Sequence, residues 1–369
     1  MLDRIREMSK RNKIIAVVVM VILVVGIGYW RGWFGKNKVN PLDLSSMKGE
    51  ADMGAPVNTG EVSPISGLPC ANWNRRPIAV MEASDVSVRP DSGFSDADLV
   101  LEMPAITASI TRMMGVYICN DPSEVGSIRS TRHDYIALAA GLNAILVHWG
   151  GSHFAGDILN KKIVDNLDLN GGMGHRAKEC GFRKEGIPAP DNGFAKFSTL
   201  LECAKKAGYE MTNKFSGYPH QAEAAADQRG KGGQLRVGFA RPYDVNYEYD
   251  LATNTYLRTW GGVADVDANN GKRNAPKNVI VVIASSEQIE GQYNNVQIGD
   301  PQFDTVMEGE AHYYFNGKEY AGRWKKDKSN WSSKLFLYDD KGAEMKFVPG
   351  QMWVEVLEPG QALKWTPTP

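Results

Sequence analysis

The chain has 369 residues, of which 43% are hydrophobic and 23% are charged, and its formal net charge is −1. This composition supplies apolar material for a sizeable core, most simply divided over two domains, and excludes a wholly disordered chain. The near-zero charge argues against a nucleic-acid-binding protein, which would usually carry a basic excess.

Residues 14–30 form an apolar run of 17 residues without one charge. As a helix, this run would span about 26 Å, at the lower end of what crosses the hydrocarbon core of a bilayer. Tyr29, Trp30 and Trp33 lie at one end, where amphipathic rings favour the membrane interface. We therefore predict a transmembrane anchor over residues 14–33.

The flank before the apolar run is the more basic one, with Arg4, Arg6, Lys10, Arg11 and Lys13. Because such residues stay on the inner side, residues 1–13 are predicted to be a cytoplasmic tail and the folded domains to be extracytoplasmic, held to the cell membrane by a single pass. The alternative is a cleaved signal peptide, but residues 30–33 are not a small-x-small cleavage site. Residues 34–67 are rich in Gly, Pro, Ser and Asp, which predicts a flexible tether.

Four cysteines follow the anchor, at positions 70, 119, 180 and 203. In an oxidising compartment they predict two disulfides, with three possible connectivities. The alternative is four buried thiols. No Cys-x-x-Cys spacing occurs, which disfavours a structural zinc site.

Residues 68–222 mix strand-like and helix-like segments. Short apolar runs at residues 77–81, 98–102, 111–119 and 144–148 predict strands, while residues 131–142, 153–163 and 194–207 predict helices. Residues 168–193 are rich in Gly, Pro and charge and are predicted to form a long loop, of the kind that is often functional. We therefore predict an α/β domain here.

Residues 234–360 are predicted to form a mostly-β domain. Strand-like runs occupy residues 235–239, 245–249, 256–260, 279–283, 311–315, 334–337 and 352–357. Asn316-Gly317 after one such run is a strong hairpin signal.

Five arginines of the first domain lie at or near the edges of predicted elements: Arg89, Arg112, Arg129, Arg132 and Arg183. Arg129 and Arg132 sit where a helix is predicted to begin, with Ser130 or Thr131 as the candidate cap. Helix N-termini favour anions, and guanidinium groups bind phosphate or carboxylate bidentately. We therefore predict an anionic ligand at these arginines. The alternative is a set of structural salt bridges to Asp96, Asp98, Glu102 or Asp134.

The turn after the strand at residues 144–148 is a second candidate, with His148, Gly150, Gly151 and Ser152. A strand that ends in a Gly-Gly turn exposes backbone amides, which favours a ligand-binding turn. A Ser–His nucleophile and a purely structural turn are the alternatives, and the spacing does not match the G-x-S-x-G elbow. The long loop carries Arg183, Asp191 and Asn192, which we hypothesise to close over this turn.

Imidazole and carboxylate groups that could bind zinc are present at His148, His153, Asp157 and His175, but their spacing matches no standard metal motif. We therefore predict neither a metal site nor a cofactor. The tryptophans of the second domain are interpreted as core residues, with stacking on sugars as the alternative.

Several short motifs occur in a fixed order along the chain. They are Ser66-Gly67-Leu68-Pro69, Arg75-Arg76-Pro77-Ile78-Ala79-Val80-Met81, Arg89-Pro90-Asp91-Ser92-Gly93, Ala97-Asp98-Leu99-Val100-Leu101-Glu102, Ile110-Thr111-Arg112, Gly126-Ser127-Ile128-Arg129-Ser130, His148-Trp149-Gly150-Gly151-Ser152, Asn316-Gly317-Lys318, Gly322-Arg323-Trp324 and Pro349-Gly350-Gln351-Met352-Trp353. This pattern, over residues 64–358, resembles the YerB-like family of bacterial extracytoplasmic proteins, usually described as lipoproteins of unknown function.

The resemblance implies location and architecture but no established activity. Two positions depart from the family pattern: relatives often carry a lipidated cysteine where this chain has an apolar run, and a Pro-His-Asn pattern reads Pro190-Asp191-Asn192 here. A catalytic histidine at that position is therefore not expected.

The preferred function is a membrane-anchored binding or scaffolding protein of the cell envelope, with an anionic glycan or phosphate ligand or an envelope protein as its partner and with no nucleic acid. The predicted ligand-binding residues are Arg89, Glu102, Arg112, Arg129, Arg132, His148, Gly150, Gly151, Ser152, Arg183 and Asn192. The alternative is a hydrolase or transferase acting on envelope polymers, with His148 or Asp191 as the base.

Overall fold

The computed structural model describes residues 61–291 and 293–369 of the chain. The predicted cytoplasmic tail, the transmembrane anchor and most of the tether fall on residues 1–60, outside the described residues. Among the residues that are described, no helix is long and apolar enough to cross a membrane. The anchor over residues 14–33 therefore stays a prediction.

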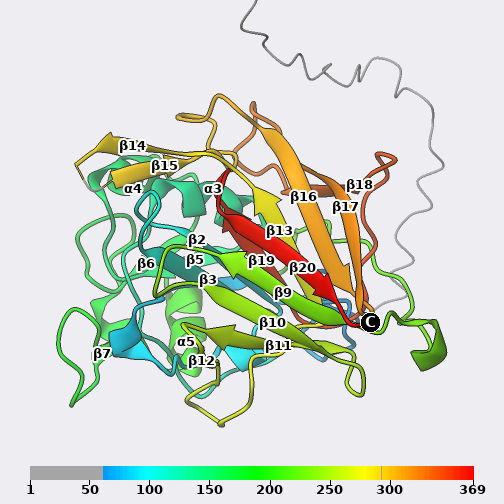
Figure 1. Ribbon diagram of the computed structural model, residues 1–369. Coiled ribbons are helices and arrows are strands. Elements are labelled where there is room, and N and C mark those ends of the chain that lie inside the picture. Colours follow the sequence, from blue (N-terminus) through cyan, green and yellow to red (C-terminus); the bar gives the residue numbers. More distant parts are fainter. Residues whose placement is uncertain (1–60, 292) are drawn as a thin grey trace, which may run out of the picture. The chain divides into compact units, whose positions relative to one another are not determined.

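A ten-stranded sheet occupies the centre of the described residues (Figure 1). Its middle strands are apolar on both faces because alternate side chains enter two different cores: in β1, Ile78 and Val80 join one core, and Ala79 and Met81 join the other. In spatial order the sheet contains β18 (Phe336–Asp339), β17 (Lys318–Lys325), β16 (Glu308–Phe315), β13 (Asn278–Ile283), β19 (Met352–Leu357), β2 (Leu99–Pro104), β3 (Thr111–Tyr117), β1 (Ile78–Ala83), β5 (Ile145–His148) and β6 (Asn166–Asp168).

Three helices cover parts of this sheet, two on one face and one on the other. They are α3 (His133–Gly141), α4 (His153–Leu159) and α5 (Phe197–Lys206). Ile136 of α3 and Ile158 of α4 belong to one core cluster, and Phe197 and Leu200 of α5 belong to the other. The described residues also contain the short 3-10 turns η2 (Val86–Val88), η3 (Phe94–Asp96), η4 (Lys178–Cys180) and η5 (Ala226–Gln228).

A five-stranded antiparallel sheet packs on the same face as α5 and lies in front of the large sheet in Figure 1. Its strands have one buried face only: in β10, Val245, Tyr247 and Tyr249 are buried and the residues between them are not. In spatial order it contains β12 (Val263–Ala264), β11 (Thr255–Trp260), β10 (Val245–Asp250), β9 (Gly233–Gly238) and β20 (Ala362–Pro367).

Short strands complete the described fold. They are the pair β14 (Ser286–Glu290) and β15 (Tyr293–Val296), and the small sheet of β4 (Val125–Gly126), β8 (Gly193–Ala195) and β7 (Phe182–Arg183). The hairpin predicted at Asn316-Gly317 is confirmed, because it joins the antiparallel strands β16 and β17. Both residues have positive φ, 51° and 66°, as the turns that join twisted antiparallel strands require.

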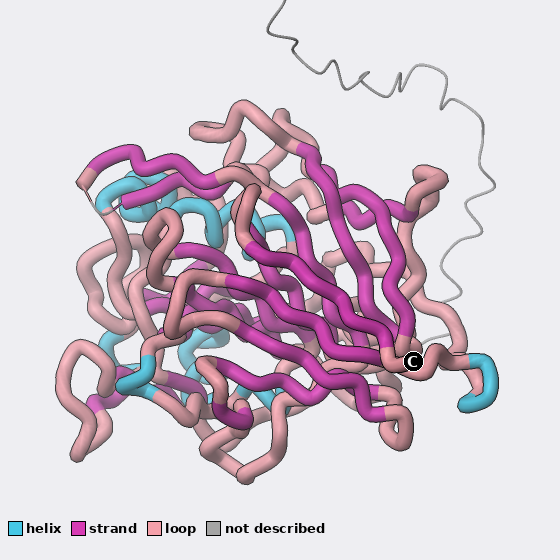
Figure 2. The backbone as a smooth tube through the Cα atoms, in the orientation of Figure 1, coloured by secondary structure: helices cyan, strands magenta, loops and turns pink. Residues whose placement is uncertain are grey.

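The fold is mostly β with few helices, as Figure 2 shows, and the α/β character predicted for the first domain is limited to the three helices. The two predicted domains share one sheet, because β2 of the first pairs in parallel with β19 of the second, Leu99 opposite Met352. Local periodicity cannot reveal such a pairing, since its partners are about 250 residues apart in the sequence.

Two disulfides form, as the cysteine count predicted: Cys70–Cys119 and Cys180–Cys203. The second joins η4, in the long loop, to α5. By the loop-entropy estimate, a crosslink over a separation of 23 residues contributes about 3 kcal/mol. Three of the tryptophans considered in the second domain, Trp260, Trp324 and Trp353, are buried, as the core interpretation predicted.

Candidate functional site

The candidate site lies where strands β1 and β5 separate. The two strands pair in parallel as far as Val80 and Val147, and the segment 127–131 then enters between them. Its backbone bonds to both sides: Arg129 N–H donates to Met81 O at 2.8 Å, and Trp149 N–H donates to Arg129 O at 3.0 Å. This point is the carboxyl edge of the parallel strands, where α/β sheets commonly bind their ligands.

Three of the predicted arginines come together at this edge. Arg112 is the second residue of β3 and lies opposite Ala83, the last residue of β1. Arg129 belongs to the inserted segment, and Arg132 is the N-cap residue of α3. We call Arg112, Arg129 and Arg132 the arginine cluster.

The positive charges of the arginine cluster act on one another. Burial, together with the nearby Arg132 and Arg129, lowers the pKa of Arg112 to about 9. Burial also lowers the pKa of Arg132, and the Arg129 charge lowers it further. A lowered arginine pKa means that the surroundings destabilise the charged guanidinium group. A bound anion would stabilise this charged form.

Few acceptors face these guanidinium groups. Arg112 Nη1 donates to Ser130 O at 2.7 Å, and Arg132 Nη1 donates to Thr131 O at 3.3 Å. The Nε atoms of Arg112 and Arg132 are buried without a hydrogen-bond partner. Within the described residues, neither arginine forms an ion pair, whereas Arg129 pairs with Asp191.

The N-terminal end of α3, where the helix dipole is positive, also lies at this edge of the sheet. The predicted caps were wrong: Arg132 is the N-cap, without a side-chain cap bond, while Ser130 Oγ donates to Trp149 O and Thr131 Oγ1 to Arg132 O. A side-chain cap would have occupied one of the first amide groups of the helix. Because Arg132 provides none, the positive end of the helix dipole adds to the arginine charges.

The long loop folds over the inserted segment. Arg183 stacks on the Trp149 ring at 4.0 Å and donates to Asn192 Oδ1 at 2.8 Å. Asp191 forms an ion pair with Arg129 and also accepts a hydrogen bond from Ser87 Oγ at 2.7 Å. Arg183 and Asn192 thus lie beside the arginine cluster, and neither belongs to it.

The His148 turn is built into the sheet edge. His148 is fully buried, with Nδ1 2.8 Å from Gly150 O and Nε2 3.3 Å from Asn166 Oδ1, and burial lowers its pKa. Gly150 N–H donates to Asp168, and Ser152 caps α4 by accepting from Ala155 N–H at 3.2 Å. Gly151 pairs with Thr131. The turn therefore positions the inserted segment.

Arg89 and Glu102 lie elsewhere, in a buried network between the two sheets. Arg89 pairs with Asp91 at 2.8 Å and with Asp265 at 2.9 Å, and it stacks on Trp260. Glu102 lies opposite Glu355 on neighbouring strands, and both meet Arg258 of β11. Arg258 also pairs with Asp265. We call this set of six charged residues the buried network: Arg89, Arg258, Asp91, Asp265, Glu102 and Glu355.

The buried network balances its own charge. It contains two guanidinium groups and four carboxyl groups. Burial raises the pKa of both Asp91 and Glu355 to about 8, so these two carboxyls carry protons at neutral pH. These two protons bring the network closer to charge balance with its two arginines.

The sequence suggested, as an alternative role for the five arginines, structural salt bridges to four acidic residues, and those pairs do not form among the described residues. None of the five pairs with Asp96, Asp98, Glu102 or Asp134 in the described part of the chain; the partners found are Asp91, Asp265 and Asp191. Among the described residues, no group of three or more His, Cys, Asp or Glu side chains is placed to hold a metal ion.

One neighbour of the cluster was not foreseen. The Arg132 guanidinium lies 5.8 Å from the ring centre of Tyr293, which comes from the β14–β15 pair in the second domain. No local signal marks Tyr293, because only the tertiary fold brings β15 beside α3.

The comparisons with known proteins agree with this architecture. Residues 65–210 match the N-terminal domain, and residues 235–354 the C-terminal domain, of the family described as protein of unknown function DUF3048. A Bacillus subtilis (strain 168) protein named "Putative lipoprotein YerB" is 28% identical over 303 residues, 80% of this chain and 86% of the relative. The chain belongs to the YerB-like family.

A solved structure of the YerB-like family shows the same fold. The crystal structure of the YerB protein from Bacillus subtilis matches with a TM-score of 0.68 and 25% sequence identity. The match covers 80% of this chain and 96% of the YerB chain. The resemblance predicted from the ordered motifs is thereby confirmed.

Proposed function

We propose that this YerB-like protein is an extracytoplasmic protein of the cell envelope, attached to the membrane, which binds an anionic ligand at Arg112, Arg129 and Arg132. The name of the Bacillus relative as a lipoprotein supports the membrane-associated location. The two disulfides support an oxidising compartment.

The predicted transmembrane segment at residues 14–33 is the proposed anchor. The four cysteines form two disulfides, which supports an apolar anchor over a lipid attached to one of these thiols. The full chain should stay in the membrane pellet after an alkaline wash and dissolve only in detergent. A variant that lacks residues 1–33 should be released, and its retention in the pellet would contradict the anchor.

The observation that supports anion binding is the uncompensated charge of the arginine cluster. Three guanidinium groups and a helix N-terminus converge, with one carboxylate, Asp191, paired to them and a second, Asp85, acting on Arg112 and Arg129 without forming an ion pair in the described part of the chain. A phosphate or carboxylate group would supply the missing negative charge and accept bidentate hydrogen bonds.

The geometry gives no support to the alternative of an envelope-polymer hydrolase or transferase. His148 is fully buried with both ring nitrogens near acceptors, so it has no access to a substrate. Asp191 is paired with Arg129 and accepts a hydrogen bond from Ser87 Oγ, so its carboxylate oxygens already have partners.

The test is a thermal-shift measurement on the full chain in mild detergent, with inorganic phosphate, a sugar phosphate and a dicarboxylate as probes. A ligand that binds only the folded state stabilises it, by about 2.7 kcal/mol at 100 times its Kd. The shift should be lost in Arg132→Ala and kept in Arg236→Ala, a matched change on the exposed face of β9.

An Arg132→Ala protein that keeps the full shift would contradict a site at the arginine cluster. A protein that responds to none of the three probes would point to the scaffolding role with an envelope protein partner.

A further inference from the structure

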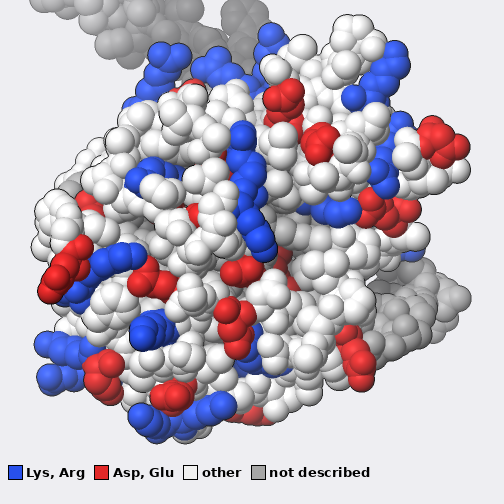
Figure 3. Space-filling view, turned by 90° about the horizontal axis from the view of Figure 1, so that it is seen from below, with Lys and Arg blue, Asp and Glu red and all other residues white. Residues whose placement is uncertain are grey.

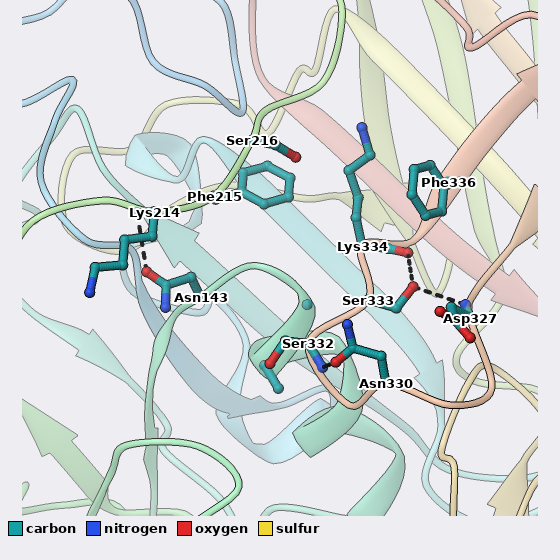
Figure 4. Close-up of a pocket in the computed structure, with 12 residues that line it drawn as sticks. Asn143, Lys214, Phe215, Ser216, Asp327, Asn330, Ser332, Ser333, Lys334 and Phe336 are labelled. Atoms are coloured by element: carbon teal, nitrogen blue, oxygen red, sulfur yellow. Dashed lines mark hydrogen bonds between the residues drawn. The ribbon is translucent and has the colours of Figure 1, made fainter.

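A cavity lies at the opposite end of α3 from the arginine cluster. Its volume is about 450 Å³, within the range of about 300–1,000 Å³ typical of small-molecule sites. The C-terminal residues of α3, the segment 214–216 and the segment 327–336 form its walls (Figure 4).

One part of the lining is apolar. The rings of Phe215 and Phe336 both face the cavity, and Figure 4 shows them on either side of the Lys334 side chain. The Lys334 ammonium lies 5.0 Å from the ring centre of Phe336, so its aliphatic stem extends the apolar surface between the rings.

The rest of the lining carries neutral polar groups with open bonding capacity. Asn143 and Asn330 use their side-chain oxygens to accept the backbone N–H groups of Lys214 and Ser332, at 3.2 Å and 2.9 Å. In the described part of the chain, their amide nitrogens and the hydroxyls of Ser216 and Ser332 have no protein partner. These groups can donate to and accept from a bound molecule.

Both lysines at the cavity are already paired, and the Asp327 carboxylate there keeps its charge. Lys214 pairs with Glu210, and Lys334 pairs with Glu344 and donates to Gly217 O. Asp327 accepts hydrogen bonds from the backbone and side chain of Ser329. An anion would meet the Asp327 charge and find both lysines occupied, unlike at the arginine cluster.

We propose that this cavity binds a neutral sugar ring of a glycan. A pyranose has an apolar C–H face and a rim of hydroxyls, which match the Phe215–Phe336 wall and the amide and hydroxyl groups opposite. The proposal is independent of the anion site, because the two sites lie at opposite ends of a helix about 13 Å long.

The test is calorimetric titration of the full chain in mild detergent with two neutral oligosaccharides, a β-linked N-acetylglucosamine oligomer and an α-linked glucose oligomer. At least one should bind. Ser332→Trp, which places a large ring in the cavity from an exposed turn, and Phe336→Ala should each weaken binding at least about tenfold, or 1.4 kcal/mol.

Two matched changes should leave the sugar affinity unaltered. Phe182→Ala removes an exposed phenylalanine from β7, and Arg132→Ala removes a member of the arginine cluster. Since Phe336→Ala removes ring contacts within β18, Ser332→Trp decides the outcome if that variant fails to fold. The proposal is overturned if neither oligosaccharide binds, or if binding survives in Ser332→Trp.

Discussion

The buried network and the arginine cluster use the same side chain in opposite ways. Arg89 and Arg258 each lie within ion-pair distance of two or more carboxyl groups, and the raised pKa values of Asp91 and Glu355 reduce the negative charge of the network at neutral pH. Arg112 and Arg132 have no carboxylate partner among the described residues and keep only backbone acceptors. The difference teaches that charge balance, and not burial, separates structural arginines from candidates for ligand binding.

Breaking the buried network should have the largest effect on stability. Arg258→Met leaves Glu102 and Asp265 buried without their cation, which should cost about 3–5 kcal/mol. The urea midpoint of the full chain in detergent measures this cost. Arg236→Met, on an exposed strand face, serves as the control, and a loss below about 1 kcal/mol for Arg258→Met would contradict the structural assignment.

The pH dependence of stability should report the protons of the buried network. Burial raises the pKa of Glu355 to about 8 in the folded state, above its ordinary value of 4.5. The stability that the protonated Glu355 contributes is therefore fully present below about pH 4.5 and is lost as the pH rises towards 8. One such group lowers stability by at most about 1.4 kcal/mol per pH unit in this window.

The urea midpoint measured from pH 5 to pH 8 therefore should fall less steeply in Glu355→Gln than in the unmodified chain. Glutamine can still accept the hydrogen bond from Tyr247 Oη, so the packing is kept. Equal slopes for both proteins would show that Glu355 is already ionised at pH 5.

Within the arginine cluster, Asp191 competes for Arg129 with any anionic ligand. Asp191→Asn should tighten phosphate binding by about twofold to fivefold, because an exposed or half-buried ion pair is worth up to about 1 kcal/mol. Titration calorimetry measures the affinity. Glu185→Gln, an exposed change in the same loop, is the control, and weaker binding by Asp191→Asn would mean that Asp191 helps to form the site.

The smallest expected effect on stability is that of Arg132→Met, and it contrasts with the large loss expected for Arg258→Met. Arg132→Met removes a half-buried cation that has no ion-pair partner in the described residues and keeps an apolar side chain of similar length. Without ligand, the free energy of unfolding from urea denaturation should stay within about 0.5 kcal/mol of that of the unmodified chain, or rise. A loss of about 2 kcal/mol would assign Arg132 to the fold.

Local sequence patterns predicted most of the central strands and helices, because these elements bury apolar side chains in the two cores. The apolar runs that became β1, β2, β3 and β5, and the helices α3 and α5, all overlap their predicted ranges. Strands β17 and β20 were missed, because most of their residues are exposed or half-buried and carry no apolar period. The face of the molecule in Figure 3 bears basic and acidic side chains interspersed.

The candidate site was predictable only in part. Arg112, Arg129 and Arg132 lie at element edges that sequence patterns reveal, so they could be selected one by one. Arg89 had the same local signal, yet its partner Asp265 lies 176 residues further along the chain. Which arginine is neutralised depends on that long-range contact.

By itself, the sequence determined the family, the two-domain order, the number of disulfides and the apolar run near the N-terminus, because composition and short motifs carry these features. The tertiary structure decided the cysteine pairing, the shared sheet, and the division of the arginines between a neutral network and a charged cluster. These outcomes depend on which distant strands become neighbours, and the energy of a buried charge depends on the groups that surround it.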